Sequence, residues 1–207
     1  GHSLGEITAL YAGEVLSFKD CVALIKIRSE LMSKAPKGSM AALIGFDRDQ
    51  LNIAIKSYKD IFIANDNSSS QVVLSGKKES LNELSNQIVC KRFMPLNVSG
   101  AFHSEFMSAP SKQFSDYLDN INFNKSILPI ISNSNPSFST NPVELKNRLK
   151  DQMCNGVRWR ETMDLMNQSE SLHIVEIGPS AVLSGLAKRH LKDIKITQVS
   201  SSEKINY

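Results

Sequence analysis

Hydrophobic positions in the first part of the chain recur with the period of a helix. Apolar residues stand every three or four positions in residues 4–11, which predicts a helix packed on a sheet. The sequence Ser-Phe-Lys-Asp at residues 17–20 is typical of a capped helix N-terminus. The helix after it is expected to run to about Lys34, because Pro36 and Gly38 follow.

The middle of the chain alternates short apolar runs with amphipathic segments. Strands are expected at residues 40–46, 61–64, 71–75 and 92–98, and helices at residues 49–57 and 79–89. A polar Asn/Ser turn is expected between the second and third strands. The order β-α-β-β-α-β is that of the split unit of ferredoxin-like folds, so residues 38–98 are expected to form a small inserted subdomain.

Residues 1–37 and 99–207 are expected to form a larger α/β subdomain. Helices are expected at residues 105–119, 143–153, 161–166 and 181–190, and strands at residues 127–132, 173–177 (buried) and 194–199. Strands that alternate with helices favour a parallel sheet covered on both faces.

Composition narrows the class of protein. Of the 207 residues, 41% are hydrophobic and 22% are charged, as in soluble globular proteins. A net charge of +3 gives no indication of nucleic-acid binding. Cys21, Cys90 and Cys154 lack metal-ligand spacing, which favours a reduced cytosolic setting and no metal site. No apolar run has membrane-spanning length and no signal peptide is visible.

The first residues, Gly1-His2-Ser3-Leu4-Gly5-Glu6, match the nucleophile elbow G-x-S-x-G. In this motif a strand turns sharply into a helix, and the serine hydroxyl is exposed on a strained backbone. The flanking glycines are expected to avoid collisions, and N–H groups of the helix to face a developing oxyanion. The strand before the elbow is missing from the sequence, which indicates N-terminal truncation. The structural alternative is a surface turn.

Arg28 interrupts an apolar stripe on the predicted second helix. A guanidinium on a core-facing position is costly unless an anion pairs with it. It either forms an internal salt bridge, extends its head to solvent, or binds a substrate carboxylate bidentately, and the spacing leaves these open.

His103 is the best candidate for the base that a nucleophilic serine needs, because it lies at a Gly-bounded junction before a helix. His2, as a neighbour in the elbow, is expected to point away from the hydroxyl. His173 and His190 have structural interpretations. No Asp stands out as a third triad member, which disfavours an ordinary hydrolase triad.

Together these residues resemble the acyltransferase family of fatty-acid and polyketide synthesis, which includes the malonyl-CoA:acyl carrier protein transacylases. The resemblance covers essentially the whole chain. It rests on residues 1–6, 28–38, 71–76, 100–104, 152–159, 176–179 and 183–186. It implies an α/β fold with a parallel-sheet, α/β-hydrolase-like large subdomain and the ferredoxin-like insert.

The resemblance also implies roles for individual residues. Ser3 and His103 would form a dyad, with the histidine oriented by a main-chain carbonyl at Gln152. Arg28 would bind the malonyl carboxylate, and the backbone N–H of Leu4 would donate to the oxyanion. A second oxyanion donor, a glutamine near the N-terminus of the family, has no counterpart in this sequence. Phe102, in Ala-Phe-His, resembles the version associated with malonyl rather than methylmalonyl selection.

The implied reaction moves a malonyl group from malonyl-CoA to the phosphopantetheine thiol of acyl carrier protein through a malonyl-serine. No cofactor is expected, and the protein is expected to be a monomer in the bacterial cytoplasm or the plastid stroma. The alternatives are a serine hydrolase or thioesterase and an inactive fragment. The pairs Lys91-Arg92, Arg158/Arg160 and Lys188-Arg189 are candidate docking charges for an acidic carrier or simply solvated surface.

Overall fold

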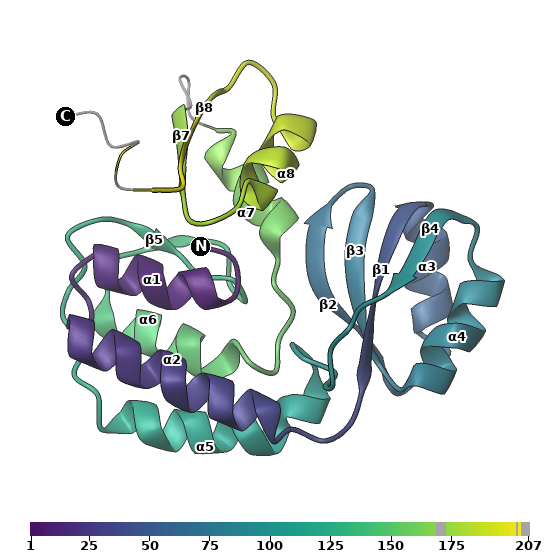
Figure 1. Ribbon diagram of the computed structural model, residues 1–207, viewed down its shortest axis with the longest axis horizontal. Coiled ribbons are helices and arrows are strands. Elements are labelled where there is room, and N and C mark those ends of the chain that lie inside the picture. Colours follow the sequence, from purple (N-terminus) through teal and green to yellow (C-terminus); the bar gives the residue numbers. More distant parts are fainter. Residues whose placement is uncertain (169–172, 202, 204–207) are drawn as a thin grey trace.

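The computed structural model describes residues 1–168, 173–201 and 203, and it is of the predicted α/β class. On one side lies a helical layer, and on the other a four-stranded sheet with its own helices (Figure 1). A third group, which consists of α7 (Trp159–Met166), β7 (His173–Ile177), α8 (Val182–His190) and β8 (Lys195–Val199), lies above both in this view. The described helices include none that is long and apolar enough to cross a membrane.

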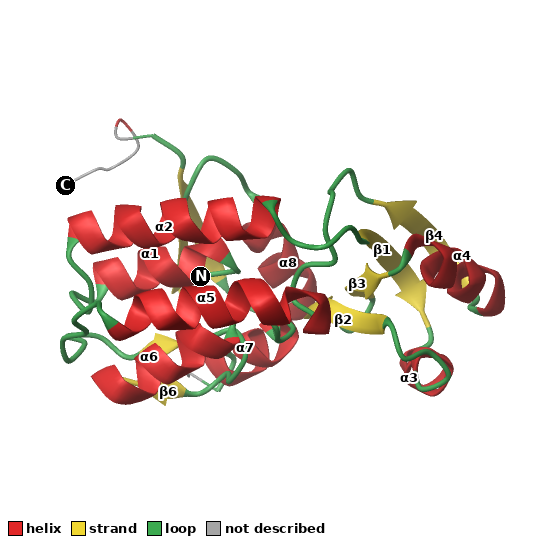
Figure 2. Ribbon diagram, turned by 90° about the horizontal axis from the view of Figure 1, so that it is seen from below, coloured by secondary structure: helices red, strands yellow, loops and turns green. Residues whose placement is uncertain are grey.

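The helical layer consists of four helices whose apolar faces share one core (Figure 2). They are α1 (Leu4–Ala12), α2 (Phe18–Ser33), α5 (Ser108–Asp119) and α6 (Pro142–Asp151). A short 3₁₀ turn, η1 (Glu105–Met107), precedes α5. The capping prediction is confirmed, because the Ser17 hydroxyl accepts the Asp20 N–H at 3.1 Å. Asn141 caps α6 in the same way.

The four-stranded sheet is built from the middle of the chain. Its elements are β1 (Ser39–Phe46), α3 (Arg48–Ile55), β2 (Ile61–Ser68), β3 (Gln71–Gly76), α4 (Lys78–Gln87) and β4 (Cys90–Pro95). All neighbours in the order β2-β3-β1-β4 are antiparallel. Apolar side chains of α3 and α4, such as Leu51 and Leu84, are buried against Leu43 and Leu74 of the strands. The predicted element order is therefore confirmed.

The predicted polar turn between the second and third strands is shorter than expected, because β2 continues to Ser68 and only Ser69 and Ser70 form the turn. The register shifts between Ile63 and Asn65 and again between Asp66 and Ser68. Tertiary contacts account for a strand with so polar a sequence. Val157 exchanges backbone hydrogen bonds of 2.8 Å with Ala64 and Asp66, and the side chains of the strand have partners of their own.

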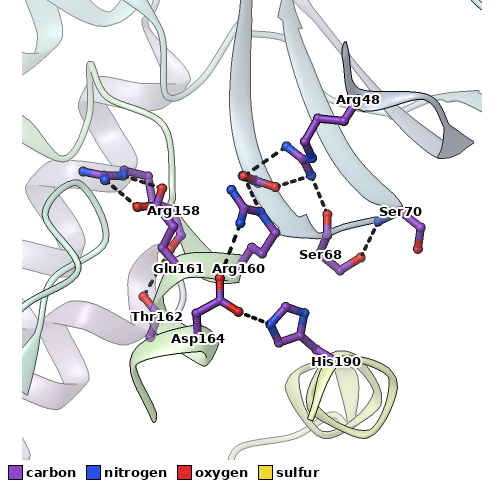
Figure 3. A network of polar contacts seen from close by, with 10 residues as sticks. Arg48, Ser68, Ser70, Arg158, Arg160, Glu161, Thr162, Asp164 and His190 are labelled. Atoms are coloured by element: carbon purple, nitrogen blue, oxygen red, sulfur yellow. Dashed lines mark hydrogen bonds and ion pairs between the residues drawn. The ribbon is translucent and has the colours of Figure 1, made fainter. Parts of the chain in front are cut away.

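An ionic network joins this polar strand to the third group of elements (Figure 3). The Asp66 carboxylate contacts Arg48 at 2.9 Å and Arg160 at 3.0 Å. Arg160 also contacts Asp164 at 3.4 Å, and the same carboxylate lies 2.6 Å from His190. The network therefore connects α3 and β2 with α7 (Trp159–Met166) and α8 (Val182–His190).

The expected single parallel sheet is not what the described residues form. Instead, β5 (Ile130–Ile131) and β6 (Phe138–Ser139) pair antiparallel, and β7 (His173–Ile177) and β8 (Lys195–Val199) pair parallel. The prediction of a buried strand at residues 173–177 is also wrong, since the Ile177 side chain is 80% exposed. Within the described chain β7 pairs with one strand, β8. A sheet of two strands buries little of the surface of either strand, so side chains such as Ile177 remain exposed.

Candidate active site

Ser3 lies at the turn that enters α1, in a backbone conformation that L-residues rarely adopt (φ 49°, ψ −106°). Its N–H donates to Asn133 Oδ1 at 2.6 Å, and its carbonyl accepts from Gln152 Nε2 at 3.0 Å. A Cβ on Gly1 would lie 2.3 Å from the Gly5 carbonyl oxygen, so the first glycine of the motif is sterically required. Apart from its neighbours along the chain, no atom of the described residues lies within 4 Å of the position that a Cβ on Gly5 would take, so no collision in this part of the chain explains the second glycine.

His103 lies beside this serine, although 100 residues separate them in the chain. Ser3 Oγ is 2.8 Å from His103 Nε2, and His103 Nδ1 is 3.0 Å from the Gln152 carbonyl oxygen. The Asn155 carbonyl is 3.3 Å from the same nitrogen. A carbonyl can only accept, so Nδ1 carries the proton and Nε2 is left to accept the Ser3 hydroxyl proton. No carboxylate contacts the ring within the described chain.

Burial keeps this imidazole neutral. Desolvation, with the nearby Arg28 charge as the next cause, lowers the pKa of His103 to about 4. The two carbonyl hydrogen bonds oppose the shift without cancelling it. A neutral histidine at physiological pH is the form that a general base requires.

Arg28 points from α2 to the same hydroxyl. Its Nη2 donates to Ser3 Oγ at 2.9 Å, and the side chain is 5% exposed. Among the described residues it forms no salt bridge, and its buried Nε has no partner. Burial lowers the Arg28 pKa, opposed by the charge of Glu6. The internal salt bridge considered for Arg28 is therefore absent from the described chain, and the guanidinium retains donors for an anion.

Phe102 and Arg28 line one open groove of about 650 Å³, together with Met32 of α2 and Val98. Leu4 is the first residue of α1, and no hydrogen bond involves its N–H in the described structure. That N–H lies where an oxyanion donor is expected, directly after the nucleophile.

The other histidines have separate partners. The ring of His2 is 5.4 Å from that of Trp159, and its Nε2 is 2.9 Å from Asn67 Oδ1, so it points away from the Ser3 hydroxyl as expected. His173 contacts Thr197, and His190 belongs to the ionic network.

Two buried residues of the site were missed in the sequence. Glu6, 1% exposed, and Asn133, 2% exposed, lie directly behind the turn. Glu6 Oε2 accepts from the Asn133 N–H at 3.0 Å and from Gln152 Nε2 at 2.9 Å. Burial raises the Glu6 pKa. Glu6 lies four residues before the buried Leu10, on the same face of α1, and a charge at that spacing is a signal of the kind that identified Arg28. Asn133 lies in a loop without any pattern.

The arrangement can perform acyl transfer with an anionic acyl group. It combines an activated hydroxyl, a neutral base, a helix N-terminus and a buried cation within one site. In the described chain no group of His, Cys, Asp and Glu side chains has the arrangement of a metal site.

Known proteins share this sequence and fold. Residues 1–205 match the acyl transferase domain family. The malonyl CoA-acyl carrier protein transacylase of Synechocystis sp. is 42% identical over 206 residues, which are 100% of this chain and 70% of that protein. Its crystal structure superposes with a TM-score of 0.95 over 99% of this chain and 70% of that chain. A malonyl-transacylase solved in complex with a type II PKS acyl-carrier protein is 30% identical, with a TM-score of 0.93 over 99% of this chain and 69% of that one.

Proposed function

Because this chain belongs to the acyl transferase family, we propose that it transfers a malonyl group from malonyl-CoA to the phosphopantetheine thiol of an acyl carrier protein. The observation that carries the proposal is the buried Arg28 guanidinium, which contacts the Ser3 hydroxyl and retains an unpartnered N–H. A cation at this distance from the nucleophile suits an acyl group that ends in a carboxylate.

In the first half-reaction, the Ser3 hydroxyl gives its proton to His103 Nε2 while Oγ attacks the thioester carbonyl. The Leu4 N–H stabilises the resulting oxyanion. The carbon–sulfur bond then breaks, and the coenzyme A thiolate takes the proton from His103. Ser3 now carries the malonyl ester, and Arg28 holds its distal carboxylate.

The second half-reaction runs the same steps with a new thiol. His103 takes the proton of the phosphopantetheine thiol, whose sulfur attacks the ester carbonyl. The bond from that carbon to Ser3 Oγ breaks, and His103 returns the proton to the serine oxygen. The Gln152 carbonyl holds the ring in one tautomer through both halves, and Phe102 shapes the groove for an acyl group without a methyl branch.

The carrier protein is the proposed partner, supported by the related transacylase that was solved with an acyl-carrier protein. Lys91-Arg92 on β4 and Lys188-Arg189 on α8 are exposed and suit an acidic partner. Arg158 and Arg160 suit it less, because Glu161 and Asp66 already pair with them. A monomer in the bacterial cytoplasm or plastid stroma, without a cofactor, completes the proposal.

We also propose that the site lies between two subdomains. Residues 38–98 would be the ferredoxin-like one, supported by the strand order β2-β3-β1-β4. Residues 1–37 and 99–207, of which 169–172, 202 and 204–207 lie outside the described residues, would belong to the α/β-hydrolase-like one.

Mass spectrometry of the chain after mixing with malonyl-CoA tests the reaction. We expect one malonyl group on the peptide that contains Ser3, stable until a carrier protein or another thiol is added. Ser3→Ala should form no adduct. Ser57→Ala, which removes an exposed hydroxyl outside the groove of Arg28 and Phe102, should behave as the parent. Free malonate released without any thiol acceptor would indicate a hydrolase, and neither adduct nor release would indicate an inactive chain.

A further inference from the structure

We propose that Glu6 is a positioning residue for the Ser3–His103 dyad, a role that rests on the proposed acyl transfer by these two residues. Its carboxylate does not reach the reacting atoms. It holds Asn133 and Gln152 instead, and these two residues hold the nucleophile and the base.

The Glu6 carboxylate is the centre of a buried network. The Asn133 N–H and Gln152 Nε2 both donate to Oε2, at 3.0 and 2.9 Å. These donors are 127 and 146 residues from Glu6 in sequence. One carboxylate therefore fixes two distant segments against the first turn of α1.

Each of the two partners makes a second contact, with the nucleophile turn. Asn133 Oδ1 accepts the Ser3 N–H at 2.6 Å, and Asn133 Nδ2 donates to the Gly1 carbonyl at 2.8 Å. Gln152 Nε2 donates to the Ser3 carbonyl at 3.0 Å. Both sides of the turn are thus held by residues that Glu6 holds.

Gln152 also carries the network to the base, because its main-chain carbonyl lies 3.0 Å from His103 Nδ1. The nucleophile and the base are therefore oriented through one residue. Movement of Gln152 changes the position of both Ser3 and the imidazole.

The backbone of Ser3 explains why such a network is needed. A residue at φ 49° has a strained backbone and keeps that conformation only where its surroundings enforce it. Hydrogen bonds to the Ser3 N–H and carbonyl provide that enforcement. Without Glu6, two buried donors lose their acceptor, and the turn loses the supports that depend on them.

A role for Glu6 as a simple counter-ion of Arg28 does not fit the geometry. The charge of Glu6 raises the Arg28 pKa, yet the two side chains form no salt bridge in the structure described. The carboxylate oxygen that has partners points at amide donors.

The test compares Glu6→Ala, Glu6→Gln and Glu176→Ala. Glu176 is a matched control, because it is also buried and accepts two N–H groups, from Leu183 and Ser184, but does not contact the dyad. For Glu6→Ala we expect the first-order rate of Ser3 acylation to fall about 10- to 100-fold, with KM for malonyl-CoA changed less than about threefold. Glu6→Gln keeps an acceptor oxygen and should recover most of the rate. Glu176→Ala should lower thermal stability comparably and leave the acylation rate within a few-fold of the parent.

A small organophosphorus fluoride, which labels an activated serine whatever its natural substrate, separates this proposal from the proposed function. Its labelling rate at Ser3 should follow the same order among the variants. Normal labelling of the parent without a malonyl adduct would contradict malonyl-CoA as the substrate. The labelling rates of the variants would still test the positioning role of Glu6. A folded Glu6→Ala variant with the parent's rates, a folded Glu6→Gln variant as slow as Glu6→Ala, or a parent chain that the reagent does not label would overturn the proposal.

Discussion

At the scale of single residues, the site combines two buried charges that have different tasks. Arg28 contacts the Ser3 hydroxyl directly, whereas Glu6 contacts amide groups behind the turn. Each is costly to bury, and each is compensated by a different kind of partner. The substrate carboxylate would pair with Arg28, whereas the Asn133 and Gln152 amide groups already donate hydrogen bonds to Glu6.

Replacing Arg28 tests the recognition of the acyl group. Arg28→Ala should lower kcat/KM for malonyl-CoA relative to acetyl-CoA by about 10²-fold or more, because a charge-assisted bidentate contact is lost. Arg28→Lys should restore only part of the preference, since an ammonium lacks the planar fork. Steady-state kinetics with both thioesters measure the ratio. Lys26→Ala removes an exposed charge from the same helix and should leave the ratio unchanged; an unchanged ratio in Arg28→Ala would remove Arg28 from this role.

The pH dependence of kcat/KM tests the state of His103. Its pKa of about 4 in the folded chain means that the ring stays neutral, and able to accept the Ser3 proton, well below its ordinary titration range. We expect activity to fall on the acid side near pH 4 and not near 6.5. The unfolded chain binds this proton at the higher pH, so unfolding free energy should decline as pH falls from about 6.5 towards 4.

Circular dichroism at each pH separates loss of the base from loss of the fold. His173→Gln, on the exposed strand β7, should leave the profile unchanged. An acid limb near 6.5 in the folded parent would contradict a desolvated His103.

The sequence identified site residues that depart from the pattern around them or belong to a known motif. Arg28 stood out from an apolar stripe and Ser3 from a turn motif, and the structure brings both to His103. Asn133 could not be found in this way, because asparagine is common in loops and belongs to no motif here. Its importance comes from contacts with Ser3, 130 residues away in sequence.

At the scale of elements, β2 is the strand that sequence reasoning shortened. Its polar residues suggested a turn, yet partners from α3 and α7 compensate them, and Asn67 at its end contacts His2 beside the nucleophile. Burial and hydrogen bonding by neighbours override local propensity here. The strand joins the small sheet to the region around the elbow.

Asp66→Asn tests this junction. The substitution leaves Arg48 and Arg160 without their shared carboxylate, whose side chain is 13% exposed. We expect a loss of about 1–3 kcal/mol in the free energy of unfolding, between the values for surface and buried pairs. Urea denaturation measures it. Asp116→Asn, which breaks the exposed pair with Lys112, should cost less than about 0.5 kcal/mol, and equal losses in the two variants would contradict a special role for Asp66.

At the scale of the whole molecule, the order of helices and strands was predictable and the way they assemble was not. Periodicity located the long helices and the strands of the small sheet. The two-residue strands β5 and β6 are too short to leave a pattern, and the exposure of β7 depends on which strands lie beside it. Assembly is decided by contacts between distant segments, which a local pattern does not contain.

The contact between Arg28 and the Ser3 hydroxyl bears on how the proposed substrate would react. The serine oxygen is then shared between a base that draws its proton away and a cation that occupies a lone pair. In the proposed reaction, the malonyl carboxylate would compete for that cation and loosen its contact with the serine oxygen. An acyl group that lacks the carboxylate would have to displace the same contact with nothing to replace it. Recognition of one end of the substrate would then set the reactivity of Ser3 towards the other end.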